Sequence, residues 1–338
     1  MQERDRFDNL MRRLARAGFK KDFVASALLP EWWEPRCADD PALLPDIELR
    51  VARFLGAQAS ALSDSTVALR PPLYPGAQLR RVRSMETDRL AAALHAATQI
   101  AAATVRSLKP TVPAAEPPPT DGLAWRRLLS AETPRVRLPA LLADIWRRGI
   151  PVIPVDVLPE PSFQALACIV AGRPAVVVAH KYDAPGRVAF LLAHEVGHIV
   201  AGDCAPEAPV VEEDCEVEDK SDIEQKADRY AFRVLAGAES APMLEATARV
   251  DLAREAARAE AESGVDAGVT LFGWAKRSGD YRTAALASQA LYRATGARRL
   301  LREHFEKWVD VDGASETDRA LLRCVSVEPA RDASPDRH

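Results

Sequence analysis

Hydrophobic residues recur at a helical spacing near the start of the chain. Two apolar faces of this kind are formed by Phe7, Leu10, Met11 and Leu14 and by Ile47, Val51, Phe54 and Leu55. Gly18 and Gly56 follow the two patterns, as glycine often does where a helix ends. Residues 1–65 are therefore predicted to form a small helical domain.

An alanine-rich helix is predicted next, over residues 86–108. Polar residues such as His95 interrupt it, which makes it too polar to span a membrane. A basic cluster precedes it, formed by Arg80, Arg81 and Arg83. We interpret this cluster as a solvated face, with contact to phosphate or an acidic partner as the alternative. Residues 66–108 form one unit, and the prolines of residues 109–121 predict an extended linker and a domain boundary.

After the linker, the pattern predicts one helix and then three strands. The helix covers residues 138–148, and the strands cover residues 151–157, 163–170 and 175–180. Residues 171–174 have the length and composition of a hairpin loop, which predicts a small antiparallel sheet.

The pattern of apolar residues in the C-terminal part predicts helices again. Helices are predicted over residues 271–277, 281–295 and 298–309, within a C-terminal domain of residues 241–328 and before a frayed tail of residues 329–338. The fold class is therefore α+β: a mainly helical domain over residues 122–240 with a small sheet, flanked by helical N- and C-terminal domains.

One helix of the central domain carries polar residues in an apolar setting. Local signals place it at residues 185–201, with Asp183 as a cap, Pro185 in the first turn and Gly202 at the end. Its residues are apolar nearly all round, so it is predicted to run through the interior. Buried polar side chains need partners, and this helix holds a run of them in the string HEVGH.

The string HEVGH contains His194, Glu195 and His198 and matches the HExxH pattern of zinc hydrolases. Two histidines four residues apart lie on one helical face and can offer two imidazole nitrogens to one ion. Glu195 is rotated about 100° from His194 and can act as general base for water at the open coordination position. The alternative is a buried helix whose two histidines are simply hydrogen-bonded.

A third ligand decides between these interpretations. Residues 221–235 predict a second helix, in which Glu224 and Asp228 lie four residues apart on one face. Glu224 can complete a His, His, Glu set, and Asp228 can orient a ligating imidazole. Alternatively, Ser221 and Glu224 form a capping box that occupies this carboxylate. The fallback ligands are acids of the loop before the helix and its start: Glu212, Glu213, Glu216, Glu218 and Asp222.

The segments VAFLLAHEVGHIV and IEQKADRYAFRVLAG together resemble the ImmA/IrrE family of bacterial zinc metallopeptidases, also described by the peptidase M78 or DUF955 domain. The first matches that family's helix at Phe190, Leu192, Ala193, His194, Glu195, Gly197 and His198, with Leu191 in place of a threonine. The second matches at Glu224, Ala227, Asp228 and Ala231, with Tyr230 in place of the usual phenylalanine. The resemblance covers roughly residues 135–240.

The resemblance implies a zincin-like, gluzincin-type domain holding one Zn²⁺ per chain through His194, His198 and Glu224, with Glu195 as general base. It also implies an endopeptidase that cleaves a specific protein, often an XRE-type repressor, in stress-response or mobile-element control. Transfer of that biology to this chain is an analogy.

Two further features of a peptidase site can be assigned to candidates. A donor for the developing oxyanion is expected, and His180, Tyr182 and Tyr230 lie close to the motif in sequence. A substrate can pair as an extended strand with a sheet edge, for which we predict the strand residues Ala175, Val176, Val177, Val178 and Ala179.

The sequence also allows two functions other than peptide hydrolysis, and one of them depends on the N-terminal helices. The segment IELRVARFLGAQASAL resembles the closing helix of an XRE-type helix-turn-helix, which makes a DNA-binding regulator with the peptidase fold as a sensor one alternative. The first half of that motif is not recognisable, so a docking domain is the second interpretation of residues 1–65. For the whole chain, a further hypothesis is a toxin-antitoxin-type interaction protein that binds partners without turnover.

Composition and charge narrow the class of protein. Apolar residues make up 48% and charged residues 28% of the 338, which is typical of a globular protein. The N-terminus lacks the apolar region of a secretory signal, and the five scattered cysteines are expected to be free thiols in a reducing compartment. Two of them, Cys204 and Cys215, are near the motif, with plain loop thiols as the preferred interpretation. We expect a cytoplasmic protein with no membrane contact.

Overall fold

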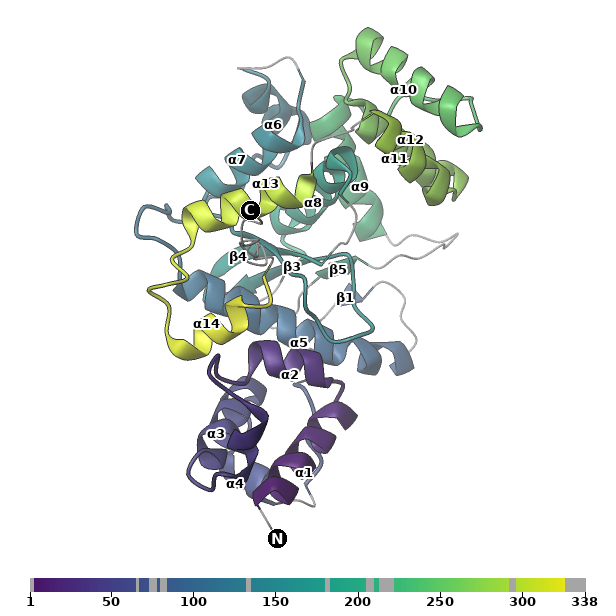
Figure 1. Cartoon of the computed structure of the whole chain (residues 1–338). Helices are drawn as coiled ribbons and strands as arrows, with labels where there is room; N and C mark the ends of the chain where they lie inside the picture. Colours follow the sequence, from purple (N-terminus) through teal and green to yellow (C-terminus); the bar gives the residue numbers. More distant parts are fainter. Residues whose placement is uncertain are drawn as a thin grey trace, which may run out of the picture.

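The computed structural model describes residues 3–64, 67–72, 78–79, 84–131, 135–179, 183–204, 210–212, 222–291 and 296–325. These residues form a mainly helical α+β fold around one small sheet, as Figure 1 shows. The basic cluster Arg80, Arg81 and Arg83 lies outside the described residues. Among the described residues, none of the helices is both long and apolar enough to cross a membrane.

The N-terminal residues form the expected group of helices. They are α1 (Glu3–Arg16), α2 (Lys21–Ala27), the 3-10 helix η1 (Pro35–Asp39), α3 (Leu44–Leu55) and α4 (Ala59–Ser63). The two glycines predicted as stops, Gly18 and Gly56, both have positive φ angles, which glycine adopts without strain. Arg13 of α1 is buried and donates to the carbonyl oxygens of Leu62 at 2.7 Å and Val67 at 2.9 Å, which closes the group. DNA binding by these helices stays a prediction.

Helix α5 (Ser84–Arg106) joins this group to the sheet. The His95 ring of α5 packs against Phe54 of α3, and on the other side of the helix Ala97 and Ile100 face the strands. The alanine-rich sequence suits this double contact, because small side chains let the helix approach two partners closely. Most of α5 from Leu90 onward is therefore buried in the interior of the molecule.

The sheet is mixed, which corrects the antiparallel sheet predicted from sequence. Its strands are β1 (Gln78–Leu79), β2 (Val152–Pro154), β3 (Ala165–Val170), β4 (Arg173–Val178) and β5 (Val210–Glu212). They lie in the order β1-β5-β3-β4-β2. The β3–β4 and β3–β5 pairs are antiparallel, whereas β2 runs parallel to β4 and β1 parallel to β5.

Strand β4 is an interior strand, so the prediction that Ala175 to Ala179 offer a free edge is wrong. β4 is hydrogen-bonded to β3 on one side and to β2 on the other. The hairpin between β3 and β4 was predicted correctly, with a turn of only two residues, Ala171 and Gly172, both at positive φ. The edge position on that side belongs to β2, whose Pro154 lacks the N–H needed for further pairing.

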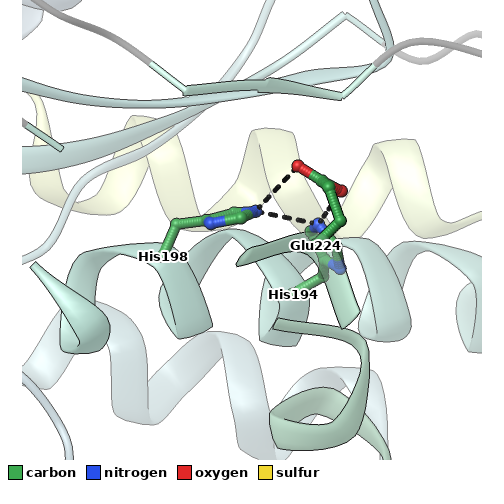
Figure 2. Close-up of side chains that lie close together, drawn as sticks. All are labelled: His194, His198 and Glu224. Atoms are coloured by element: carbon green, nitrogen blue, oxygen red, sulfur yellow. Dashed lines mark hydrogen bonds and ion pairs between the residues drawn. The ribbon is translucent and has the colours of Figure 1, made fainter. Parts of the chain in front are cut away.

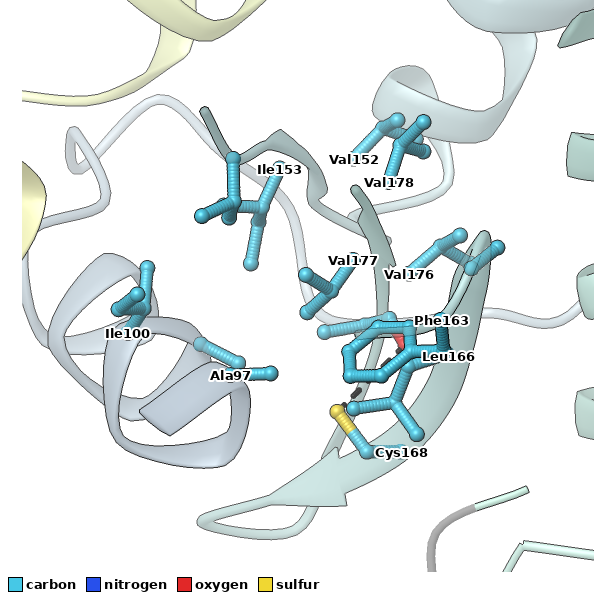
Figure 3. Close-up of a cluster of buried hydrophobic side chains, with 14 of the residues drawn as sticks. Ala97, Ile100, Val152, Ile153, Phe163, Leu166, Cys168, Val176, Val177 and Val178 are labelled. Carbon is cyan, nitrogen blue, oxygen red and sulfur yellow. Dashed lines mark hydrogen bonds between the residues drawn. The ribbon is translucent and has the colours of Figure 1, made fainter. Parts of the chain in front are cut away.

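Helices cover both faces of the sheet. Figure 3 shows Leu166, Cys168 and Val177 pointing toward Ala97 and Ile100 of α5. Val176 and Val178 point to the opposite face, against which α8 (Pro185–Ala201) lies. The residues of β2, β3 and β4 are nearly all apolar because both faces of these strands are covered. The helix that carries HEVGH is thereby fixed on a rigid layer.

The proline-rich stretch of residues 109–121 is bound along its length. The N–H of Lys109 donates to Trp308, the N–H of Glu116 donates to Arg148, and Arg173 donates to the carbonyl of Pro113. It ends at Asp121, whose side chain caps α6 (Gly122–Leu129), a helix that the sequence pattern did not predict. The stretch is extended, but it lies on the surface of one body instead of separating two.

The C-terminal residues divide between a lobe and the central body. Helices α10 (Arg249–Ser263), α11 (Ala267–Ser278) and α12 (Tyr281–Leu291) pack on one another, next to α8 and α9 (Asp222–Ala236). Helix α13 (Ala297–Trp308) returns to pack on β2 and α7 (Leu138–Arg147). Helix α14 (Glu316–Leu322) packs on α5 and α2. The described helices of the C-terminal part thus contact different elements of the central part, and the predicted domain of residues 241–328 stays a prediction.

Candidate metal centre

The helix that carries HEVGH has the bounds expected from its sequence. α8 runs from Pro185 to Ala201 and ends at Gly202, whose φ of 76° reverses the chain. The predicted cap is wrong, because Ala184 occupies that position and provides no side-chain hydrogen bond. Asp183 instead accepts the backbone N–H of Arg298 at 2.8 Å, at the start of α13. The carboxylate that was assigned to α8 thus stabilises the first turn of another helix.

Helices α8 and α9 cross at small residues, which brings their polar faces together. A Cβ atom at Gly197 would lie 3.3 Å from the Cα of Ala227 and 3.3 Å from the Tyr230 ring, a distance closer than ordinary packing. Glycine in HEVGH and alanine in the second motif therefore allow this approach. The crossing buries His194, Glu195 and His198 almost completely, and only 4% of the surface of Glu224 is exposed.

Three side chains from the two helices converge, as Figure 2 shows. The Nε2 atoms of His194 and His198 are 3.0 Å apart, and the Glu224 carboxylate oxygens lie 3.4 Å and 3.6 Å from them. Atoms bound tetrahedrally at the usual zinc distances of about 2.0–2.1 Å are separated by roughly 3.3 Å. The three donor atoms are thus spaced as ligands of one small cation, and this group can hold a metal ion.

A carboxylate fixes each imidazole from behind. His194 Nδ1 donates to Asp228 at 3.0 Å, as the sequence predicts, and His198 Nδ1 donates to Asp203 at 2.9 Å. A proton on Nδ1 leaves the lone pair on Nε2, the atom that faces the cluster. Both rings therefore present the tautomer that a metal ligand requires.

Asp203 was not predicted, although a local signal for it exists. The left-handed Gly202 turns the chain so that the N–H of Asp203 donates to the carbonyl of His198 at 3.0 Å. This turn brings the Asp203 side chain back beside the ring of the same residue. An aspartate directly after the terminal glycine of a metal-binding helix is therefore the pattern to look for.

The environment keeps His198 neutral and the neighbouring thiols protonated. Burial, followed by the proximity of His194, lowers the pKa of His198 from its ordinary value. Burial raises the pKa of Cys168 to about 12, and the negative charge of Glu195 adds to this rise. Cys204 is affected in the same way, so it is interpreted as a buried thiol and not as a ligand. Cys215 lies outside the described residues.

Glu195 is the acidic residue between the two histidines of the motif. Its negative charge contributes to the raised pKa values of Cys168 in β3 and of Cys204, which follows the end of α8. Glu195 is next to His194 in the chain and fully buried.

The other predicted site residues are not brought together here. His180 and Tyr182 lie outside the described residues, as do Ser221, Glu213, Glu216 and Glu218. Tyr230 donates its hydroxyl proton to the carbonyl of Pro119 at 2.8 Å, which argues against its predicted role as an oxyanion donor. Asp222 is exposed at the start of α9, and Glu212 lies in β5. The Glu224 carboxylate faces the two imidazoles, and the alternative capping box with Ser221 involves a residue outside the described part of the chain.

Comparisons of this chain with protein-family models, with curated proteins and with solved structures gave no match. The interpretation of the site therefore depends on its own geometry.

Proposed function

We propose that this protein is a zinc-dependent endopeptidase with a zincin-like catalytic domain. The observation that carries the proposal is the set of three converging donor atoms, with each ligating imidazole held by its own carboxylate. Structural zinc sites are usually closed by four protein ligands rich in cysteine, whereas His, His, Glu sets with three protein ligands are typical of catalytic sites. The group of His194, His198 and Glu224 belongs to the second kind.

The donor set favours zinc over the common alternatives. Calcium and magnesium prefer six or more oxygen ligands, and this site offers two nitrogens and one carboxylate. Neutral imidazole with a carboxylate suits zinc and other divalent transition metals. Zinc is the ion that such a set holds in hydrolases, and we expect one ion per chain.

The reaction that these residues support is hydrolysis of a peptide bond. A bound zinc ion would polarise the scissile carbonyl and acidify a water molecule. Glu195 then accepts the proton of the attacking water and later delivers it to the leaving nitrogen. Asp228 and Asp203 hold the two imidazoles in place throughout. No side chain of the protein forms a covalent bond to the substrate.

The proposed substrate is a specific protein. The resemblance of the two motifs to ImmA/IrrE peptidases implies a regulatory protein as substrate, and we propose that class here.

The test replaces the general base without touching the ligands. Glu195→Gln is nearly isosteric and should retain the metal, but hydrolysis should fall by about 10²–10⁴-fold because proton transfer is lost. We would co-express the wild type or the variant with the products of neighbouring genes and identify new N-termini by mass spectrometry. Cleavage that appears only with the wild type supports the proposal. Equal cleavage by the zinc-loaded variant contradicts it.

A further inference from the structure

The lobe formed by α10, α11 and α12 is built around its own small interior. Its buried residues include Leu252 of α10, Leu271 and Trp274 of α11 and Ala287 of α12. The lobe lies beside α8 and α9 at one corner of the molecule, as Figure 1 shows. Nothing in the mechanism above uses it, although it lies directly against the metal-binding helices.

Helix α11 is the element through which the lobe contacts the metal helices. The start of α11 meets the start of α8 at two glycines, since a Cβ at Gly186 would lie 2.3 Å from the backbone of Gly268. Further along, the rings of Phe272 and Phe190 pack with their centroids 4.8 Å apart. Two consecutive contacts of this kind fix both the position and the rotation of α11 on α8.

One turn beyond Phe272, Lys276 reaches the metal centre. Its Nζ atom lies 2.6 Å from Asp228 Oδ1, the same oxygen that accepts the His194 Nδ1–H at 3.0 Å. The Lys276 ammonium also lies 4.6 Å from the centroid of the Phe190 ring. Both members of the ion pair are largely buried, with 13% of each side chain exposed.

We propose that Lys276 is a positioning residue, through which the α10–α12 lobe holds Asp228 against His194 and so keeps the metal in place. The inference rests on the proposed zinc centre and adds to it a control point outside the two motifs. Lys276 is 48 residues from Asp228 in the chain. The metal site is therefore complete only when the α10–α12 lobe is packed against α8.

Lys276 has two opposing effects on metal binding by His194. Its positive charge draws electron density from Asp228, which alone would make His194 a slightly weaker ligand. Without it, however, the largely buried Asp228 carboxylate would lose its cationic partner, and removing one partner of a buried pair is strongly destabilising. The carboxylate would turn toward solvent and leave His194. The loss of position therefore outweighs the gain in ligand strength.

The experiment is a double-mutant cycle on zinc affinity, measured in the full-length protein by competition with a chromophoric chelator. Lys276→Met keeps the length of the side chain and its contact with the rings. We expect it to weaken zinc binding by about tenfold to a hundredfold, the usual range for loss of a partner of a ligating histidine. Asp228→Asn should give a loss of similar size, and the double variant should lose no more than Asp228→Asn alone.

A spectroscopic measurement separates positioning from general destabilisation. The absorption bands of the cobalt-substituted protein report ligand geometry, and they should shift in Lys276→Met and Asp228→Asn alike. Lys226→Met changes an exposed lysine of α9 and should leave both the bands and the affinity unchanged. An unchanged affinity in Lys276→Met, or a full additional loss in the double variant, overturns the inference while leaving the zinc centre intact. A wild type that binds no zinc would overturn the proposed function itself.

Discussion

Helices α5 and α8 both carry buried histidines, and the two regions treat them differently. His95 of α5 is 1% exposed, and its Nε2 lies 2.6 Å from the carbonyl oxygen of Phe54, with aromatic rings around it. His194 and His198 are equally buried, but each has a carboxylate on Nδ1, and their Nε2 atoms converge. Burial of a histidine is therefore no sign of a metal site. What matters is that two rings are fixed from behind and share a third donor.

The largest effect should come from removing that third donor. Glu224→Ala is expected to weaken zinc binding more than a hundredfold, since a zinc site worth about 10–16 kcal/mol is held here by three protein ligands and should lose at least roughly 3 kcal/mol with one of them. Equilibrium competition with a chelator measures the change. The matched control is Asp222→Asn, which removes an exposed acid two residues earlier and should leave the affinity unchanged. If the two variants behaved alike, Glu224 would not be the third ligand.

A smaller loss is expected when a ring is released from behind. Asp203→Asn takes the charge from the partner of His198 and should reduce zinc affinity by about tenfold to a hundredfold. The same titration is suitable, with circular dichroism to show that the fold is retained. An affinity equal to that of the wild type would mean that His198, like His95, needs no oriented partner.

The smallest effect on zinc binding is expected at His95, which acts on stability alone. Burial lowers the pKa of His95 from 6.5 to about 4. Between these two pH values, His95 is protonated in the unfolded chain and neutral in the folded one. Stability of the metal-free protein should therefore rise with pH between about 4 and 6.5 and level off above, with a contribution of about 1.4 kcal/mol per pH unit.

His95→Gln removes that titration and can still donate to the Phe54 carbonyl. Urea unfolding of both proteins across this pH range isolates the contribution of His95, because the lowered pKa of His198 acts equally in both. Zinc content should not change. Identical pH dependence in the two proteins would show that His95 is not held neutral by its surroundings.

Helices α8 and α9, which carry the candidate metal ligands, were predictable because their signals are local. The bounds of α8, the ligand spacing in HEVGH and the pairing of Glu224 with Asp228 on one face all follow from helical periodicity within a few residues. The β3–β4 hairpin is local in the same sense. Asp203 could also have been found, since only Gly202 separates it from the end of α8.

The rest depends on contacts between distant segments. β1 pairs with β5 through Gln78 and Val210, and no pattern near either residue specifies that partner. The parallel placement of β2 beside β4 made the sheet mixed and removed the expected edge, and α13 from the C-terminal part packs on β2. Lys276 reaches Asp228 from a separate lobe. The proline-rich residues 109–121 had the composition of a linker, but their carbonyl and N–H groups found partners on the same body.

The most direct test of the central claim is the metal content of the native protein. Full-length protein purified without chelators should contain close to one zinc ion per chain by inductively coupled plasma mass spectrometry. His95→Gln should contain the same amount, and His194→Ala should contain almost none. A folded wild type that holds no zinc after growth in zinc-supplemented medium, or a His194→Ala variant that holds as much as the wild type, would contradict the account.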